Sequence, residues 1–129
     1  MNSSLTILLL SVLIALTPIH GLCASVTYTC HYPIYADDKG VHNSEDNLKL
    51  VFIVDSVKET AKIGGSDGRS DVNVDMLYSP SGGMAFIEKK SGVDVLTTSI
   101  DKHGRSVHSR NVIVDRQVSP TQYYGRCTK

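Results

Sequence analysis

The pattern of apolar and polar residues changes once along the chain. Residues 5–16 are apolar apart from Thr6 and Ser11, whereas after residue 24 apolar and polar positions mostly alternate. Alternation with a period of two is typical of strands that bury one face. The sequence therefore predicts an apolar leader, residues 1–24, followed by a single β-rich domain, residues 25–129.

Turn-forming residues interrupt the alternating part about every ten positions, which is the spacing of short strands joined by tight turns. Strands are expected at residues 26–30, 48–54, 60–63, 72–78, 84–89, 93–100 and 106–114. An open sheet leaves unpaired edges that invite association with other chains, so such a meander tends to close on itself. The sequence predicts an all-β fold, an antiparallel meander of about seven or eight strands that closes into a small barrel or sandwich.

Two segments are predicted to lie outside these strands. Residues 33–47 are largely polar, rich in acidic side chains and contain Gly40, so we expect them to form the longest loop. The final segment, residues 120–127, carries the adjacent pair Tyr123-Tyr124. Because a tyrosine can pack its ring while its hydroxyl forms a hydrogen bond, we expect one ring inside and one outside, with the segment as a plug at the barrel end.

The leader has the features of a secretory signal peptide, with a short apolar run and small residues at the cut after Cys23 or Ala24. The run is short for a membrane-spanning helix. No Lys or Arg precedes it, so an uncleaved membrane anchor is the alternative. A lipoprotein is disfavoured because Ile19-His20-Gly21-Leu22, before Cys23, is not the small-residue approach that its processing usually needs. We expect the mature chain to be periplasmic or secreted.

The cysteines support export. Removal of the leader discards Cys23 and leaves Cys30 and Cys127 near the two ends of the mature chain. In an oxidising compartment two cysteines placed in this way predict a structural disulfide. The loop-closure model gives such a bridge about 4–5 kcal/mol of stabilisation. Two free thiols or a redox pair are the alternative, which the absence of a C-x-x-C motif disfavours.

The net charge of the chain and the length of its apolar segments limit the kinds of partner that it can have. The chain has 13 basic and 13 acidic side chains, so its formal net charge is zero. Without a basic excess we expect no nucleic-acid partner. No segment after the leader is apolar over a membrane-spanning length, so no membrane span is expected in the mature chain. We expect a partner that is a protein or another component of the cell envelope.

Motifs for metals and cofactors are not found. The histidines after the leader form no H-x-H or H-x-x-x-H pair, and a zinc site needs three or four converging ligands. The acidic residues of 33–47 lack the spacing of an EF-hand. The glycine-rich segment 64–68 precedes a strand and lacks a following Lys-Ser/Thr, unlike a phosphate-binding loop. No cofactor or metal ion is therefore expected.

One group of residues deserves comparison with a catalytic site. Ser106, His108 and Arg110 share one face of a strand. Neighbours two positions apart on a strand are separated by roughly 6–7 Å, too far for a nucleophile and its base without convergence of the side chains. We interpret the three residues as a polar stripe that faces solvent or a partner. A small hydrolase that uses His108 is the alternative.

A recognisable pattern covers nearly the whole expected mature chain, and the segments that carry it are Val26–Cys30, Leu48–Asp55, Val107–Arg110 and Gln122–Cys127. In these segments the chain resembles a group of small exported proteins of alphaproteobacteria to which no activity is assigned. The resemblance implies export and a small β-protein, and it implies no mechanism.

A second resemblance is to periplasmic inhibitors of C-type lysozyme. Those proteins are small disulfide-bridged β-barrels in which a Ser-Gly-x-x-Tyr loop enters the lysozyme cleft. Here Ser81-Gly82 begins a similar loop, but Ala85 stands at the tyrosine position and Phe86 follows it. The resemblance implies that loop 79–86 would carry inhibition.

The sequence as a whole predicts a binding or structural protein of the cell envelope and no enzyme. A lysozyme inhibitor and a small hydrolase are the alternatives. The residues expected to contribute to a binding surface are Ser81, Gly82, Phe86, His108, Arg110, Tyr123 and Tyr124.

Overall fold

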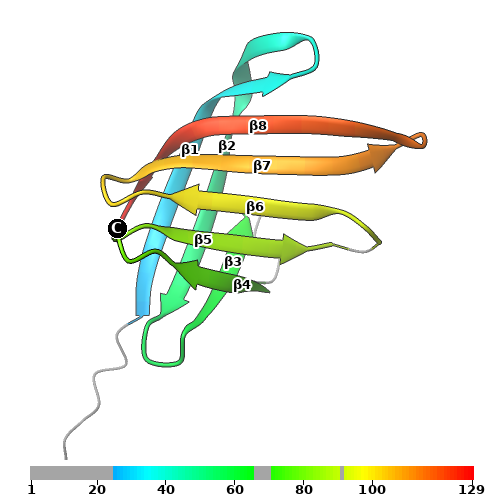
Figure 1. Cartoon of the computed structure of the whole chain (residues 1–129). Helices are drawn as coiled ribbons and strands as arrows, with labels where there is room; N and C mark the ends of the chain where they lie inside the picture. The colour runs from blue at the N-terminus through cyan, green and yellow to red at the C-terminus, as the bar shows by residue number, and fades with distance from the viewer. Residues whose placement is uncertain (1–24, 66–70, 91) are drawn as a thin grey trace, which may run out of the picture.

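The structure, a computed structural model, describes residues 25–65, 71–90 and 92–129. The strands are β1 (Ser25–Asp37), β2 (Gly40–Asp55), β3 (Thr60–Gly65), β4 (Val72–Tyr78), β5 (Met84–Lys89), β6 (Val95–Ile100), β7 (Arg105–Val114) and β8 (Gln117–Thr128). Each strand pairs antiparallel with the next, and β8 pairs with β1, so the sheet closes into a barrel (Figure 1). The predicted all-β meander is confirmed. The leader predicted at residues 1–24 lies outside the described residues.

The barrel interior is filled by the inward-facing residues of the strands. Phe52 of β2 and Phe86 of β5 stack with their ring centroids 4.2 Å apart, and both are almost fully buried. The other buried apolar residues are Tyr28, Cys30, Tyr32, Val54, Ala61, Ile63, Val74, Leu96, Ile100 and Cys127. Removing apolar surface from water stabilises the fold by about 25 cal/mol per Å². Within the described residues no helix is long and apolar enough to cross a membrane.

The seam between the first and last strands is held covalently. Cys30 of β1 and Cys127 of β8 are direct partners in the strand register and form a disulfide, as predicted. A disulfide at this position is consistent with an oxidising compartment. Nearby, a Cβ on Gly125 would overlap the carbonyl of His31, so this position in β8 has room only for glycine.

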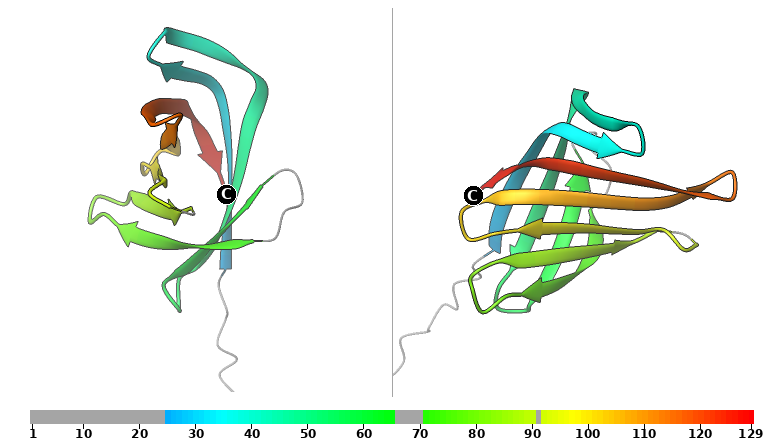
Figure 2. Two further views of the ribbon diagram at one scale, coloured as in Figure 1. Left: turned by 90° about the vertical axis from the view of Figure 1, so that its right-hand side faces the viewer. Right: turned by 45° about the horizontal axis from the view of Figure 1, so that its top comes forward.

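Two hairpins extend past their neighbours in the sheet. The β1–β2 pairing continues to Asp37 and Gly40, although β3 pairs with β2 only from Leu50. The β7–β8 pairing continues to Val114 and Gln117, beyond the last partner of β6. Figure 2 shows the end of the β1–β2 hairpin curving over beside β7 and β8. The two hairpins are therefore placed to form the walls of a site.

The structure corrects two sequence predictions. Residues 33–47 are not a long loop but the distal part of the β1–β2 hairpin, with a turn at Asp38 and Lys39. Both faces of this part are largely polar, so it lacks the alternation that identifies a half-buried strand. Residues 120–127 are not a plug but part of strand β8. The expected division of Tyr123 and Tyr124 is confirmed, with Tyr123 packed against the core and Tyr124 on the outside.

Candidate functional site

A continuous row of rings runs from the β1–β2 hairpin into the barrel. His42 stacks on Tyr35 with 4.8 Å between ring centroids, and Tyr35 lies 5.7 Å from Tyr123. The row continues from Tyr123 to His108 at 5.9 Å and from His108 to Tyr32 at 6.0 Å. These separations are within the range of favourable ring contacts. Strand register produces much of the row, because Tyr123 pairs directly with both Tyr35 and His108.

Hydrogen bonds fix the buried end of this row. The hydroxyl of Ser106 donates to the backbone carbonyl of Ser99 at 2.9 Å, so Ser106 accepts the 2.8 Å bond from the Tyr32 hydroxyl. Thr98 Oγ1 and His108 Nδ1 are 2.8 Å apart. Buried polar groups are stable when they are paired in this way. The inner polar residues therefore form a fixed, satisfied network.

This network corrects the interpretation of the Ser106, His108 and Arg110 stripe. The three residues do share one face of β7, but Ser106 and His108 are each only 3% exposed. The stripe faces the barrel interior and not solvent. Alternation identifies residues on a common face, but it cannot show which face is inside when that face is polar.

Burial also sets the charge state of the network. Desolvation by burial, together with the smaller effects of the positive charges of Arg110 and Lys90, lowers the pKa of His108 to about 4. Burial raises the pKa of Tyr32 to about 12, although the bond with Ser106 acts in the opposite sense. Both rings are thus uncharged at neutral pH. A general base works best when its pKa lies near the operating pH, and among the described residues no carboxylate bonds to His108.

A polar cavity of about 770 Å³ lies at the outer end of the ring row. We call it the hairpin cavity, because β2 residues of the β1–β2 hairpin and residues of β7 and β8 line it. The residues that line it are Tyr35 of β1, His42, Asn43, Ser44, Glu45, Asp46, Leu48 and Lys49 of β2, Arg110 of β7 and Tyr123 of β8. The volume is within the usual range of small-molecule sites.

Arg110 gives this cavity its most unusual feature. Its Nε atom is buried, and no described residue accepts a hydrogen bond from it. A guanidinium stays protonated in proteins, so Arg110 cannot lose its charge to escape the penalty. A buried donor without a partner costs about 1–3 kcal/mol. The cavity is therefore lined by a cationic side chain with an unsatisfied donor, beside the half-buried rings of Tyr35 and Tyr123.

The outer wall of the cavity is held in place by Asp37. His42 Nε2 lies 2.9 Å from Asp37 Oδ1, which also accepts the backbone N–H of Lys39 at 2.8 Å. These contacts lower the pKa of Asp37, with the His42 hydrogen bond as the largest cause. The pairing fixes the imidazole on the face of Tyr35. Asp37 and His42 thus act as positioning residues for the tyrosine.

The structure brings together three of the residues expected in a binding surface. His108 lies in the ring row, Arg110 lines the hairpin cavity, and Tyr123 belongs to both. Ser81 and Gly82 lie elsewhere, exposed on the turn between β4 and β5. This turn is closed by two backbone hydrogen bonds, one from the Ser79 N–H to the Gly83 carbonyl and one from the Gly82 N–H to the Ser79 carbonyl.

Two further expected residues do not belong to this site. Phe86 is 1% exposed and stacks on Phe52, so its assignment to a binding surface was wrong. It follows the turn as an inward position of β5. Tyr124 is 40% exposed on the outer face of the barrel. A role of loop 79–86 in lysozyme inhibition stays a prediction. Because Phe86 is buried, this loop has no accessible aromatic ring that could enter a cleft.

Sequence reasoning missed Tyr35 and His42. Both belong to residues 33–47, which were interpreted as loop. Their contact depends on the hairpin register, in which Tyr35 and His42 are direct partners. The spacing of two aromatic residues around a central Asp-Lys turn was the only local signal. Within the described residues, no three His, Cys, Asp or Glu side chains are grouped as metal ligands.

Comparisons with protein-family models, with curated proteins and with solved structures found no match to this chain. Neither of the two resemblances drawn from the sequence is tested by them. Function is therefore argued from the geometry of the cavity.

Proposed function

We propose that this chain is an exported, non-enzymatic binding protein, periplasmic or secreted, that takes a small ligand into the hairpin cavity. The ligand would carry one anionic group for Arg110 and a ring that packs on Tyr35 and Tyr123. The observation that carries this proposal is the buried, unpartnered Nε of Arg110. An anionic acceptor would satisfy this donor with a charge-assisted hydrogen bond.

The surrounding residues support a ring as the second part of the ligand. Tyr35 and Tyr123 are half-buried, and each already makes ring contacts, so their positions are fixed before a ligand arrives. Preorganised side chains lose less freedom on binding. The tyrosine rings offer apolar area and their hydroxyls offer hydrogen bonds, which suits an aromatic acid or a sugar acid.

The buried network supports binding over hydrolysis. His108 is uncharged, is bonded to Thr98 and has a low pKa, while the Ser106 hydroxyl donates to a backbone carbonyl. A nucleophile of this type needs a hydrogen bond to its base and an orienting acid. The disulfide supports the exported location.

The test compares two ring acids with their neutral analogues. Benzoate and galacturonate are titrated by calorimetry against the mature protein, with benzamide and galactose as uncharged counterparts. We expect at least one acid to bind saturably and Arg110→Gln to weaken it by about tenfold or more. Arg116→Gln makes the same charge change at the exposed tip of the β7–β8 hairpin and should leave affinity unchanged.

Two results would argue against the proposal. If the neutral analogues bind as tightly as the acids, or if Arg110→Gln has no effect, Arg110 does not select an anion. If the protein inhibits C-type lysozyme and Ser81→Trp abolishes inhibition while Arg110→Gln preserves it, the turn between β4 and β5 is the functional site.

A further inference from the structure

A second recess lies on the outer face of the barrel, on the opposite side of the sheet from the ring row. One outward residue from each of five neighbouring strands stands at the same level of the register. In strand order these are Leu77, Ala85, Ser99, Val107 and Tyr124, each a direct partner of the next. They line a cavity of about 830 Å³ whose lining is mainly apolar. We call this cavity the outer groove.

The sizes of these side chains explain the recess. Ala85 and Ser99 are small and occupy the middle, whereas Leu77 and Tyr124 are large and stand at the two ends. Leu77 is 58% exposed and Tyr124 40% exposed, so much of their apolar area faces solvent. Four inter-strand spacings give the groove a length of about 19 Å.

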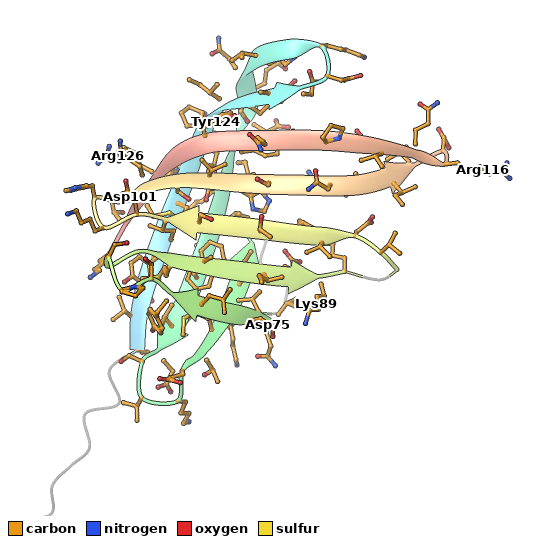
Figure 3. The ribbon with its side chains drawn as sticks, in the orientation of Figure 1. Asp75, Lys89, Asp101, Arg116, Tyr124 and Arg126 are labelled. Atoms are coloured by element: carbon orange, nitrogen blue, oxygen red, sulfur yellow. A yellow bond between two sulfur atoms is a disulfide. The ribbon has the colours of Figure 1, made fainter. Side chains whose placement is uncertain are left out.

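The charged residues of the outer groove lie along one flank of it, at the ends of the strands next to the turn between β6 and β7. Arg105 of β7 and Arg126 of β8 line it beside Tyr124, together with Asp101. Figure 3 shows Asp101, Tyr124 and Arg126 toward the same end of the sheet. Arg105 Nε is paired with Asp101 at 2.6 Å, whereas the Arg126 side chain donates to the backbone carbonyl of His103 at 3.0 Å. Among the described residues, no acidic side chain is paired with Arg126.

We propose that the outer groove binds a free fatty acid, with its carboxylate at Arg126 and its chain across the strands to Leu77. The carboxylate matches the fork of guanidinium donors. An elongated floor with the small residues Ala85 and Ser99 at its middle can take an extended alkyl chain. This site is separate from the hairpin cavity and stands without it.

The experiment uses decanoate, with decanol as the uncharged analogue of equal chain length. Calorimetry measures affinity, and a proton–nitrogen correlation spectrum locates the bound chain. We expect saturable decanoate binding with shifts at Ala85, Ser99 and Val107. Ser99→Trp fills the groove from an exposed position and should weaken binding by about tenfold or more. Val95→Trp is its matched control, on the same strand face but outside the groove, and should have no effect.

Arg126→Gln keeps the groove floor intact, so it decides the matter even if a tryptophan variant misfolds. We expect decanoate affinity to fall by about five- to tenfold while decanol affinity is unchanged. Arg116→Gln is the control for the change in net charge. The proposal is overturned if decanoate does not bind, if Ser99→Trp and Val95→Trp behave alike, or if Arg126→Gln changes nothing. Shifts confined to the hairpin cavity would also overturn it.

Discussion

Cys30 and Cys127 face each other across β1 and β8, and their disulfide closes the barrel at the seam between its first and last strands. The bridge spans 97 positions of sequence, so it restricts nearly all of residues 25–129 in the unfolded chain. It joins the same two strands that pair Tyr35 with Tyr123, which lies four residues before Cys127 in β8. The covalent link therefore holds together the two strands that carry these tyrosines.

Replacing both cysteines should destabilise the protein strongly. The loop-closure model predicts a loss of about 4–5 kcal/mol for the Cys30→Ser, Cys127→Ser double variant. Urea unfolding of the oxidised protein, compared with the variant and with the reduced protein, measures this loss. Equal unfolding midpoints for all three would show that the bridge contributes no stability, and a mass showing two free thiols would show that it does not form.

His108 should make stability depend on pH between about 6.5 and 4. Its pKa is lowered to about 4 in the folded state, from 6.5, so the unfolded chain takes up a proton first as the pH falls. Stability is therefore complete above pH 6.5 and decreases through this window by up to about 3 kcal/mol. Chemical denaturation at several pH values measures the slope.

The variant that isolates this effect is His108→Gln, which we expect to flatten the pH profile in that window. His103→Gln is the control, because His103 is exposed on the turn between β6 and β7. The pKa values of Asp37 and Asp101 are also lowered in the folded state, from 3.8. These two carboxylates therefore reduce stability only at more acidic pH, below about 3.8, where the unfolded chain takes up their protons first. An unchanged slope in His108→Gln would assign the dependence to other groups.

Phe86 should matter for folding and not for surface recognition. It stacks on Phe52 at the centre of the core, so Phe86→Ala leaves a cavity and should destabilise the protein by about 3–5 kcal/mol. Ser81→Ala in the neighbouring turn should change stability by less than about 0.5 kcal/mol. Thermal unfolding compares the two. A mild effect of Phe86→Ala would contradict the burial of its ring.

A single substitution in the turn between β7 and β8 should increase the stability of the protein. Asp115 and Arg116 both have positive φ, at 50° and 67°, in a two-residue connection between Val114 and Gln117. Such turns favour glycine at the second position because other residues are strained there. Arg116→Gly should raise the free energy of unfolding by about 1 kcal/mol, whereas Arg116→Ala should give no such gain. Denaturant titration distinguishes them, and equal values would argue against strain.

Much of the fold could be predicted from the sequence because alternation and turn residues act locally. Strands such as Val72–Tyr78 and the pairing of Cys30 with Cys127 were predicted from apolar periodicity and cysteine placement. The polar hairpin of residues 33–47 was not predicted, because its two strands are recognised by their pairing register and not by a pattern of apolar residues. The alternation of Tyr123 and Tyr124 was predicted, but which partner each would meet was not.

The candidate site was predicted only in part for the same reason. His108, Arg110 and Tyr123 were recognised as chemically capable residues. These residues come close to Tyr35 and His42 only because β1 and β8 are neighbours. That pairing forms when the barrel closes. His108 is buried together with the polar residues Thr98 and Ser106. No pattern in the neighbouring sequence marks its position as buried.

The most direct test of the central claim observes the Arg110 Nε–Hε group in a proton–nitrogen spectrum, assigned by its loss in Arg110→Gln. If the hairpin cavity is an anion site, adding the ring acid that binds should shift this signal saturably, and its neutral analogue should not. An Arg110 signal that stays in place while the acid binds would contradict the account.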